Sequence, residues 1–452
     1  MTASASQPGP ARNLLDIPWV RAFLKSPLYP GIFAYPVLVV FGYIVYALLW
    51  GPTAASANVG TSLTWVLWWP LIPIAMFTLG RFWCAICPFG TLIDVVGKAV
   101  GLGRPVPVFL KRYGIWIIDA TFILITWSDH VFGVVENPRG SGYLLGAMAT
   151  AAVVTAVLYQ RRTWCRYLCF LGGLNGNYSR ASMVELRATP DLCATCTTQS
   201  CYKGSAAAPG CPVFEFPRMM QTSANCNFSA NCVKSCPNDS IRISTRPPTR
   251  ELWFMNRPKF EESFLAAVIV GIVIVQNVTM IGWWGGVLQS LTALLFGSEA
   301  LAFTAAFLVA MLLPIAVIAL ASSLRAPWTG ESWKKNFARF GYSVIALDLA
   351  GHIAHNLFHL LSEGRSVLYT TVNAFGGYAG GSLAVLPMNV VQGLQFAVVG
   401  LGIAGSLFTA YQIARRAAPG AWKPAVLPHA AVIVLFGLLN VFLFTLPMVH
   451  RV

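Results

Sequence analysis

The chain has 452 residues, of which 56% are hydrophobic and only 10% are charged. Soluble domains carry about 25% charged residues, so this composition excludes an ordinary soluble protein and indicates long stretches that do not face water. The net charge of +15 is compatible with nucleic-acid binding. However, Lys and Arg gather in the loops between apolar stretches, as they do in the cytoplasmic loops of membrane proteins. We therefore expect no nucleic-acid partner.

About nine apolar stretches are long enough to cross a hydrocarbon core of about 30 Å. They cover residues 31–50, 60–80, 114–133, 142–159, 264–284, 300–323, 341–361, 390–413 and 426–448. The predicted fold is an all-α polytopic membrane protein that contains a small α+β ferredoxin-like insertion. The basic residues place the N-terminus and the insertion in the cytoplasm, and the C-terminus in the periplasm, of a bacterial inner membrane.

Four domains are expected along the chain. Residues 1–30 form a cytoplasmic tail, and residues 31–160 form a membrane domain with two hairpins that end in cysteine pairs. Residues 161–262 form a cytoplasmic ferredoxin-like iron–sulfur domain. Residues 263–452 form a second membrane domain, which has a histidine-bearing helix and no cysteine.

All eleven cysteines fall on the predicted cytoplasmic side. Thiols stay reduced in that compartment, so metal binding explains the cysteines better than disulfides do. The insertion opens with one cysteine pair and then carries seven more cysteines, with spacings that approach the runs of bacterial two-cluster ferredoxins. In those runs the last cysteine, followed by proline, ligates the other cluster.

This pattern predicts two clusters in the insertion. The ligand sets are Cys193, Cys196, Cys201 and Cys236 for the first cluster, and Cys211, Cys226 and Cys232 for the second. The fourth position of the second set is Ser229, which leaves open a serine-ligated cube, a three-iron cluster or an open site. Zinc is the alternative, but the insertion contains no histidine and its Cys-Pro endings favour iron–sulfur clusters.

The other four cysteines form pairs at the hairpin ends. Cys84 and Cys87 lie in RFWCAICPFG, and Cys165 and Cys169 lie in RTWCRYLCFLGG. Neighbouring arginines would offset the negative charge of a four-thiolate cluster. We expect the four thiols to share a cluster, which gives two to three clusters in total, mainly [4Fe-4S]. The alternatives are that they ligate the soluble clusters, or that they pack as buried thiols without metal.

The motifs GRFWCAICPFG, RTWCRYLCFLGG, GCPVFEFP and NCNFSANCVKSCPNDSIRI resemble the membrane-bound polyferredoxins related to NosR, NapH and CcoG. The resemblance covers residues 30–250. It implies cytoplasmic-side clusters that exchange electrons with the quinone pool or a redox partner protein, with a multisubunit complex as one arrangement. The chain departs from the pattern at Phe170, where proline is usual, and at Ser229, where cysteine is usual. We also expect no large flavin-binding domain before the first span, which argues against a NosR role.

One predicted span carries four ionisable side chains at helical spacing: Asp348, His352, His355 and His359. Ionisable groups in a span are costly and usually face a cavity or a partner. The candidate sites are haem b held by His355 or His359 with His450 or His130, a quinol or proton site at Asp348 and His352, and a copper or other metal site at His355, His359, Met448 and His450. A polar network without a ligand is the remaining interpretation.

The expected function is one-electron transfer between a cytoplasmic donor or the quinone pool and a partner redox enzyme. The chain would then be an electron-transfer subunit of an oxidoreductase system, and no catalytic residue is predicted. Because all the cysteines lie at one face, electrons would need a further carrier to cross the bilayer. The alternative is an assembly factor that supplies electrons or metal to a respiratory metalloenzyme. A transporter or a redox sensor has less support in the sequence.

Overall fold

The computed structural model describes residues 12–449, and most of them are helical. Within this range, eight helical segments are long and apolar enough to cross a membrane. They are Gly31–Trp50 (α2), Val59–Val100, Pro138–Leu158 (α8), Phe260–Thr279 (α15), Glu299–Leu324 (α17), Trp333–Ser362, Met388–Ala417 (α22) and Trp422–Thr445 (α23). These helices indicate a membrane protein, as the composition predicts.

The ninth expected stretch lies in α7 (Val108–Phe132), which is not among the eight. Charged residues near both ends and in the middle of α7 reduce its apolar character. The helix nevertheless covers the full depth of its neighbour α8. Before α7, the backbone of Arg104 pairs with that of Tyr159 at the end of α8. After α7, the Val134 carbonyl accepts a hydrogen bond from the Ser141 hydroxyl at the start of α8. A count of nine spans is therefore not confirmed.

Two of the eight segments contain several helical elements. Val59–Val100 comprises α3 (Val59–Thr61), a π-helical segment (η3, Ser62–Trp68), α4 (Trp69–Leu79), a short turn (η4, Gly80–Phe82), α5 (Trp83–Ile86) and α6 (Pro88–Val100). Trp333–Ser362 comprises α19 (Trp333–Phe340), a turn (η6, Gly341–Val344) and α20 (Ile345–Ser362). Gly80 has a φ of 64°, a conformation that glycine adopts without strain. It redirects the chain just before the first cysteine pair.

Shorter elements connect the long helices. They are η2 (Ala55–Ala57), α9 (Thr163–Tyr167), α10 (Phe170–Arg180), α16 (Trp284–Leu294), α18 (Ala326–Thr329) and α21 (Arg365–Ala374). Of these, α9 and α10 follow α8 and carry the second cysteine pair toward the soluble part of the chain.

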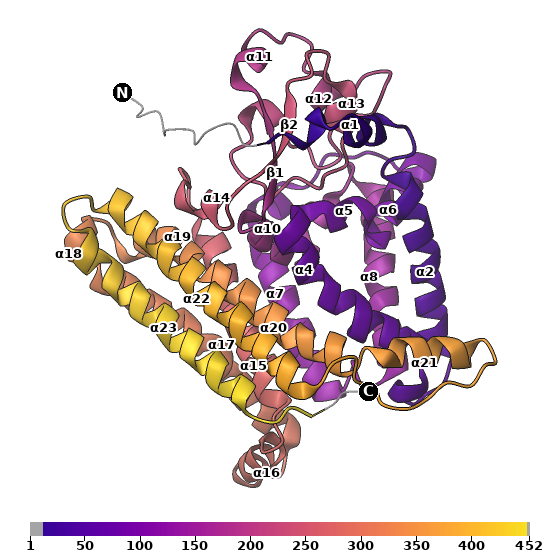
Figure 1. Cartoon of the computed structure of the whole chain (residues 1–452), viewed down its shortest axis with the longest axis vertical. Coiled ribbons are helices and arrows are strands. Elements are labelled where there is room, and N and C mark those ends of the chain that lie inside the picture. Colours follow the sequence, from indigo (N-terminus) through magenta and orange to yellow (C-terminus); the bar gives the residue numbers. More distant parts are fainter. Residues whose placement is uncertain (1–11, 450–452) are drawn as a thin grey trace.

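Residues 181–259 form a small body, here called the cysteine module, at one end of the helices (Figure 1). Strand β1 (Val184–Ala188) pairs antiparallel with β2 (Ile241–Thr245). The module also contains α11 (Pro190–Ala194), α12 (Ser200–Lys203), η5 (Pro217–Met219), α13 (Asn231–Ser235) and α14 (Arg250–Trp253). Because the described residues contain one two-stranded sheet, the expected ferredoxin-like fold is not confirmed.

The segment before the first span packs against the module. It contains a turn (η1, Leu14–Asp16) and α1 (Pro18–Lys25), which lies against α13. Tyr29 is buried in the same apolar cluster as Phe228, and its hydroxyl donates to the Phe228 carbonyl at 2.6 Å. The segment therefore supports the loop that carries Cys226 and Ser229.

Helices α15 to α20, α22 and α23 form a second helical block beside the front block of α2 to α8, whereas α21 lies across the end of the front block against η3 and α3 (Figure 1). Helix α20 lies at the junction, because it packs against α22 and α15 and also against α4 of the front block. Its side chains are almost all buried. The ionisable residues of α20 therefore lie inside the protein, between the two blocks.

Candidate metal centres

The two cysteine pairs at the hairpin ends share one local design. The first cysteine of each pair, Cys84 or Cys165, lies in a short helix, α5 or α9. The second, Cys87 or Cys169, is the N-cap residue of the next helix, α6 or α10. A helix N-terminus carries partial positive charge and unpaired N–H groups, so this design favours negative charge at both second cysteines. Both pairs have this design, although Pro88 follows Cys87 whereas Phe170 follows Cys169.

The structure brings these four thiols together. Burial raises the pKa of Cys169, and the charges of Cys165, Cys87 and Cys84 raise it further, so all four lie within electrostatic reach of one another. Burial also raises the pKa of Cys165, although Arg162 opposes this shift. Buried thiols that disfavour one another's ionisation become ligands only when bound metal supplies positive charge. This donor set, here called the hairpin-end site, therefore fits an iron–sulfur cluster.

Arg162 ties the two hairpins together at this site. Its guanidinium donates to both carboxylate oxygens of Asp94 on α6, at 3.0 and 2.7 Å, and to the Cys84 carbonyl at 3.2 Å. Gly90 makes room for it, since an added Cβ would lie 2.0 Å from Arg162 Nη1. Bidentate pairs of this kind fix orientation as well as distance. The sequence indicated the positive charge of Arg162 but not its contact with Asp94.

The four cysteines of the first predicted ligand set meet in one place. Cys193, Cys196, Cys201 and Cys236 line a common cavity, here called the first module site. Burial, followed by the charges of the other three, raises the pKa of Cys201 to about 11. Ser240 contacts two of them, because its N–H donates to Cys236 Sγ at 3.3 Å and its hydroxyl lies 2.9 Å from Cys193 Sγ. These are the residues expected at the first cluster.

A second cavity is lined by Cys211, Cys226, Cys232 and Ser229 and is here called the second module site. Burial raises the pKa of Cys226 to about 12, and the charge of Cys211 contributes to this shift. The residues on either side of Ser229, Phe228 and Ala230, have φ values of 52° and 58°. Positive φ is strained for residues other than glycine and is concentrated at functional sites. Ser229 thus lies where the sequence pattern expects a fourth ligand.

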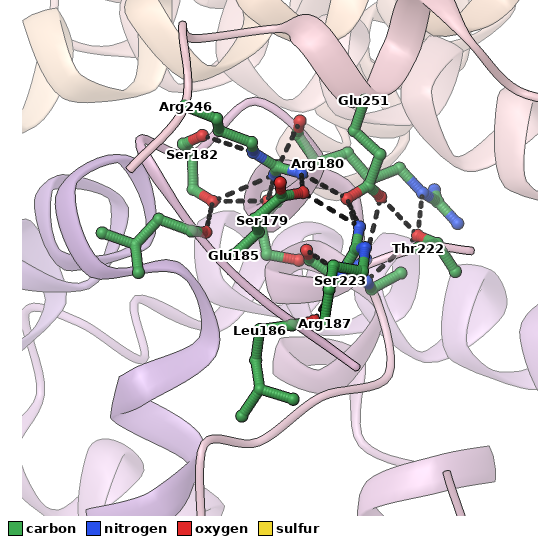
Figure 2. A network of polar contacts seen from close by, with 12 residues as sticks. Ser179, Arg180, Ser182, Glu185, Leu186, Arg187, Thr222, Ser223, Arg246 and Glu251 are labelled. Atoms are coloured by element: carbon green, nitrogen blue, oxygen red, sulfur yellow. Dashed lines mark hydrogen bonds and ion pairs between the residues drawn. The ribbon is translucent and has the colours of Figure 1, made fainter. Parts of the chain in front are cut away.

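A buried charge network joins the module to α10 (Figure 2). Arg246 donates to Glu251 at 2.6 Å and to the Ser179 carbonyl at 2.7 Å. Glu251 also pairs with Arg187 at 2.9 Å and accepts from the Ser223 N–H at 2.9 Å. Burial alone would raise the pKa of Glu251, but the two arginines outweigh it and hold this pKa below its usual range. The network therefore fixes the loop before the second module site against the helix that follows Cys169.

The four ionisable residues of α20 are all buried. His355 Nδ1 lies 2.8 Å from Asn277 Oδ1, and His359 Nδ1 lies 2.9 Å from a carboxylate oxygen of Glu363. His352 and Asp348 instead contact α10, through the Tyr178 hydroxyl at 3.0 Å from His352 Nδ1 and 3.5 Å from the Asp348 carbonyl. The predicted polar face of this helix therefore reaches the front block.

Within residues 12–449, no group of three or more His, Cys, Asp or Glu side chains is arranged to hold a single metal ion. His450 lies outside the described residues, and Met448 pairs through its backbone with Ile281. His130 lies 3.0 Å from the Thr279 hydroxyl of α15 and stacks on Phe303. The haem, quinone and single-metal interpretations of the histidines remain predictions.

Sequence reasoning missed the side chains on α10. The Asn175 amide donates to Cys84 Sγ at 3.6 Å, and Tyr178 contacts α20. The only local signal was a run of polar residues, NGNYSR, directly after an apolar cysteine motif. That run falls inside the predicted soluble insertion, which begins at residue 161.

Comparison with known proteins associates the two hairpin-end cysteine pairs with iron–sulfur binding. Residues 61–107 and 141–183 match the family described as 4Fe-4S binding domain, and each segment contains one pair. A stretch of 191 residues, 37% of this chain, is 27% identical to the "Putative electron transport protein YccM" of Escherichia coli (strain K12) and covers 51% of that protein. The chain thus spans about half the length of this relative. No solved structure matches the chain.

These matches, together with the apolar helices, support an iron–sulfur electron-transfer role in a membrane. The 4Fe-4S match does not extend to the seven cysteines of the module. The resemblance to NosR-type proteins is not confirmed.

Proposed function

We propose that the chain is a membrane electron carrier with one iron–sulfur cluster at the hairpin-end site and one at each module site. Its ligands would be Cys84, Cys87, Cys165 and Cys169 at the hairpin ends, Cys193, Cys196, Cys201 and Cys236 at the first module site, and Cys211, Cys226, Cys232 and Ser229 at the second. The convergence of the four hairpin-end thiols, in segments that match a 4Fe-4S binding domain, carries this proposal. Bound clusters of this type accept and release single electrons.

The protein's own residues set the conditions for that transfer. The Arg246–Glu251 network keeps the module against α10, so the distance between the module sites and the hairpin ends stays fixed. Arg81, which is 6% exposed, donates to the Ala224 carbonyl in the loop before Cys226. Its charge, with that of Arg162, offsets the negative charge of the thiolates.

We propose that α7 is a ninth crossing, with the N-terminus and the module in the cytoplasm of a bacterial inner membrane and the C-terminus in the periplasm. The basic residues of the module and of the loops beside it support this orientation. Asn13 pairs with Ser244 of the module, whereas Met448 pairs with Ile281 after α15, at the other end of the helices (Figure 1). Electrons would pass between a cytoplasmic donor or the quinone pool and a partner redox enzyme.

Iron and sulfide analysis of anaerobically purified protein, with EPR spectroscopy, tests the proposal. Three clusters predict about 12 iron atoms per chain, and two predict about 8. The variant Cys165→Ser should lose one EPR signal and its iron, and Cys226→Ser should lose a different one. Zinc without iron, or one signal lost in both variants, would contradict the three-site proposal. An optical spectrum of the dithionite-reduced sample tests haem b in the same experiment, through its sharp α bands.

A further inference from the structure

A series of buried polar side chains leads from the hairpin-end site into the second helical block. The Asn175 amide donates to Cys84 Sγ at 3.6 Å. One turn later on α10, the Tyr178 hydroxyl lies 3.0 Å from His352 Nδ1 and 3.5 Å from the Asp348 carbonyl. Tyr178 is 0% and His352 is 1% exposed. An ionisable group on α20 is therefore in direct contact with the helix that begins after Cys169.

An aromatic side chain provides a second contact between the same two places. The Trp69 ring lies 5.8 Å from the His352 ring and 6.4 Å from the ring of Phe170, which follows Cys169. Charges interact strongly where protein excludes water. A negative charge added at the hairpin-end thiols should therefore stabilise a positive charge on His352.

Further polar groups continue along α20 toward the end away from the module. They include His355, which contacts Asn277, and His359, which contacts Glu363. From Asp348 to Glu363 the helix rises about 22 Å. Along this face, Asp348 Oδ2, His352 Nε2, Asn356 Oδ1 and Gln395 Oε1 are buried without a hydrogen-bond partner in the protein. Buried polar atoms of this kind are the ones that ordered water serves, so the face suits the passage of protons.

Few other ionisable groups lie close enough to His352 to take up a proton in its place. Among the described residues of the elements packed against α20, Tyr342 of η6 bonds to Glu262 of α15 at 2.7 Å, and Glu262 also pairs with Arg180. The remaining elements are η3, α4, α22 and α23. Helices α4, α22 and α23 contribute to this face the non-ionisable side chains Trp69, Gln395 and Asn440, and η3 contains no ionisable residue. On α20 itself, Asp348 precedes His352 by one turn, and His355 and His359 follow it.

We propose that His352, with Tyr178 and Asp348, takes up one proton each time the hairpin-end site gains one electron. The inference rests on the proposed function, because it requires a redox site at the four cysteines. The electron comes from the module sites, and the proton comes from water at the Glu363 end of α20. Net charge in the protein is therefore unchanged, and both leave again when a one-electron acceptor oxidises the site.

The contacts of Tyr178 explain how His352 can hold the proton. In the neutral ring, Nδ1 accepts from the Tyr178 hydroxyl at 3.0 Å. After uptake, Nδ1 carries hydrogen and donates to the Tyr178 oxygen. The hydroxyl hydrogen then turns to the Asp348 carbonyl at 3.5 Å. Both protonation states thus keep their hydrogen bonds, and the Asp348 side chain lies one helical turn from the new charge.

The test is a redox titration of the purified full-length protein at several pH values, followed by EPR. The hairpin-end signal is the one that Cys165→Ser removes. Because its reduced state binds the proton more tightly, its midpoint potential should fall as pH rises. The limit is about 59 mV for a tenfold change in proton concentration in a one-electron, one-proton reaction. The signals of the module sites should not move with pH.

Variants decide whether His352 is responsible. In His352→Gln the pH dependence should disappear, and in Tyr178→Phe it should shift to another pH range. His429→Gln is the matched control, because His429 is also fully buried but contacts Ser322 and Phe340 instead of α10. This control should keep the wild-type slope. Iron content shows whether each variant still assembles its sites, and if His352→Gln loses iron, Tyr178→Phe decides.

Three outcomes overturn the inference: a pH-independent potential in the wild type, a wild-type slope in His352→Gln, or an unchanged curve in Tyr178→Phe. A wild-type protein without any iron–sulfur signal overturns the proposed function as well. A hairpin-end signal that is present but independent of pH overturns the proton uptake alone. The two failures are therefore distinguishable.

Discussion

The hairpin-end site and the second module site hold their cysteines by different means. At the hairpin ends, the second cysteine of each pair caps a helix, and the Arg162–Asp94 pair joins the two hairpins. At the second module site, Cys211 and Cys226 lie on loops and Cys232 lies in the short helix α13, and the loop before α13 has strained backbone at Phe228 and Ala230. These loops depend on polar contacts with α10 and on Tyr29. Helix N-termini and one ion pair thus fix the first site, whereas the second depends on loops that side-chain contacts hold in place.

The largest effect should follow from Glu251→Gln, which tests whether the module depends on its buried charges. The change removes the charge that pairs with Arg246 and Arg187 but keeps the size of the side chain. Breaking a buried pair costs about 3–5 kcal/mol. We expect a value near the lower end, because Glu185 still lies 3.1 Å from Arg246. Pulse proteolysis in urea should show the module cleaved at lower denaturant.

Asp239→Asn is the matched control for this variant. Asp239 is half exposed and pairs with Lys25 at 2.6 Å and with Arg21. Exposed pairs contribute at most about 1 kcal/mol, so cleavage of the module should change little. Equal effects of the two substitutions would show that the buried network has no special part in holding the module.

The pH dependence of module stability should reflect the same network. The pKa of Glu251 is held below its usual range, which in unfolded chains is about 4.3. Its contribution is complete at pH values above that number and is lost as pH falls through the lower folded-state pKa. Unfolding curves measured from about pH 7 to about pH 3 should therefore show a steep loss of module stability in acid. Glu251→Gln should lack part of it, and an identical acid loss would assign the effect to other carboxylates.

Gly90→Ala tests how Arg162 holds the hairpin-end site. The new Cβ would lie 2.0 Å from Arg162 Nη1 and 2.8 Å from its Cζ, so Arg162 must move away from Asp94. Overpacking of this kind costs about 1–3 kcal/mol, and the hairpin-end EPR signal should weaken while the module signals persist. Gly146→Ala on α8 is the control, since its Cβ would meet nothing within 4 Å. Weakening of all signals equally would mean that the sites are not independent.

The parts that sequence predicts well are those with local signals. Long apolar runs predict helices, and cysteine spacing predicts which thiols meet, because both depend on neighbours along the chain. Helix α7 is a borderline case, because the sequence predicts a span at residues 114–133 but its charged residues keep it out of the eight segments that are long and apolar enough to cross a membrane. The contact of Tyr178 with His352 joins residues 174 positions apart, and the Arg246–Ser179 bond joins residues 67 apart. Such pairs leave no periodicity to detect, so the connection between the two blocks required the structure.

The smallest change in stability, with a clear spectroscopic effect, is expected from Ser229→Cys. The substitution adds a fourth thiol to the cavity of Cys211, Cys226 and Cys232, and the cavity has room for the larger sulfur atom. We expect a stability change within about 0.5 kcal/mol, an altered EPR signal for one cluster, and about one more iron atom per chain if the native site holds three. Ser244→Cys on β2 adds a thiol away from the cavity and should change nothing. If Ser229→Cys also leaves the spectrum unchanged, Ser229 is not near the metal, and the loops of the second module site position a three-ligand site.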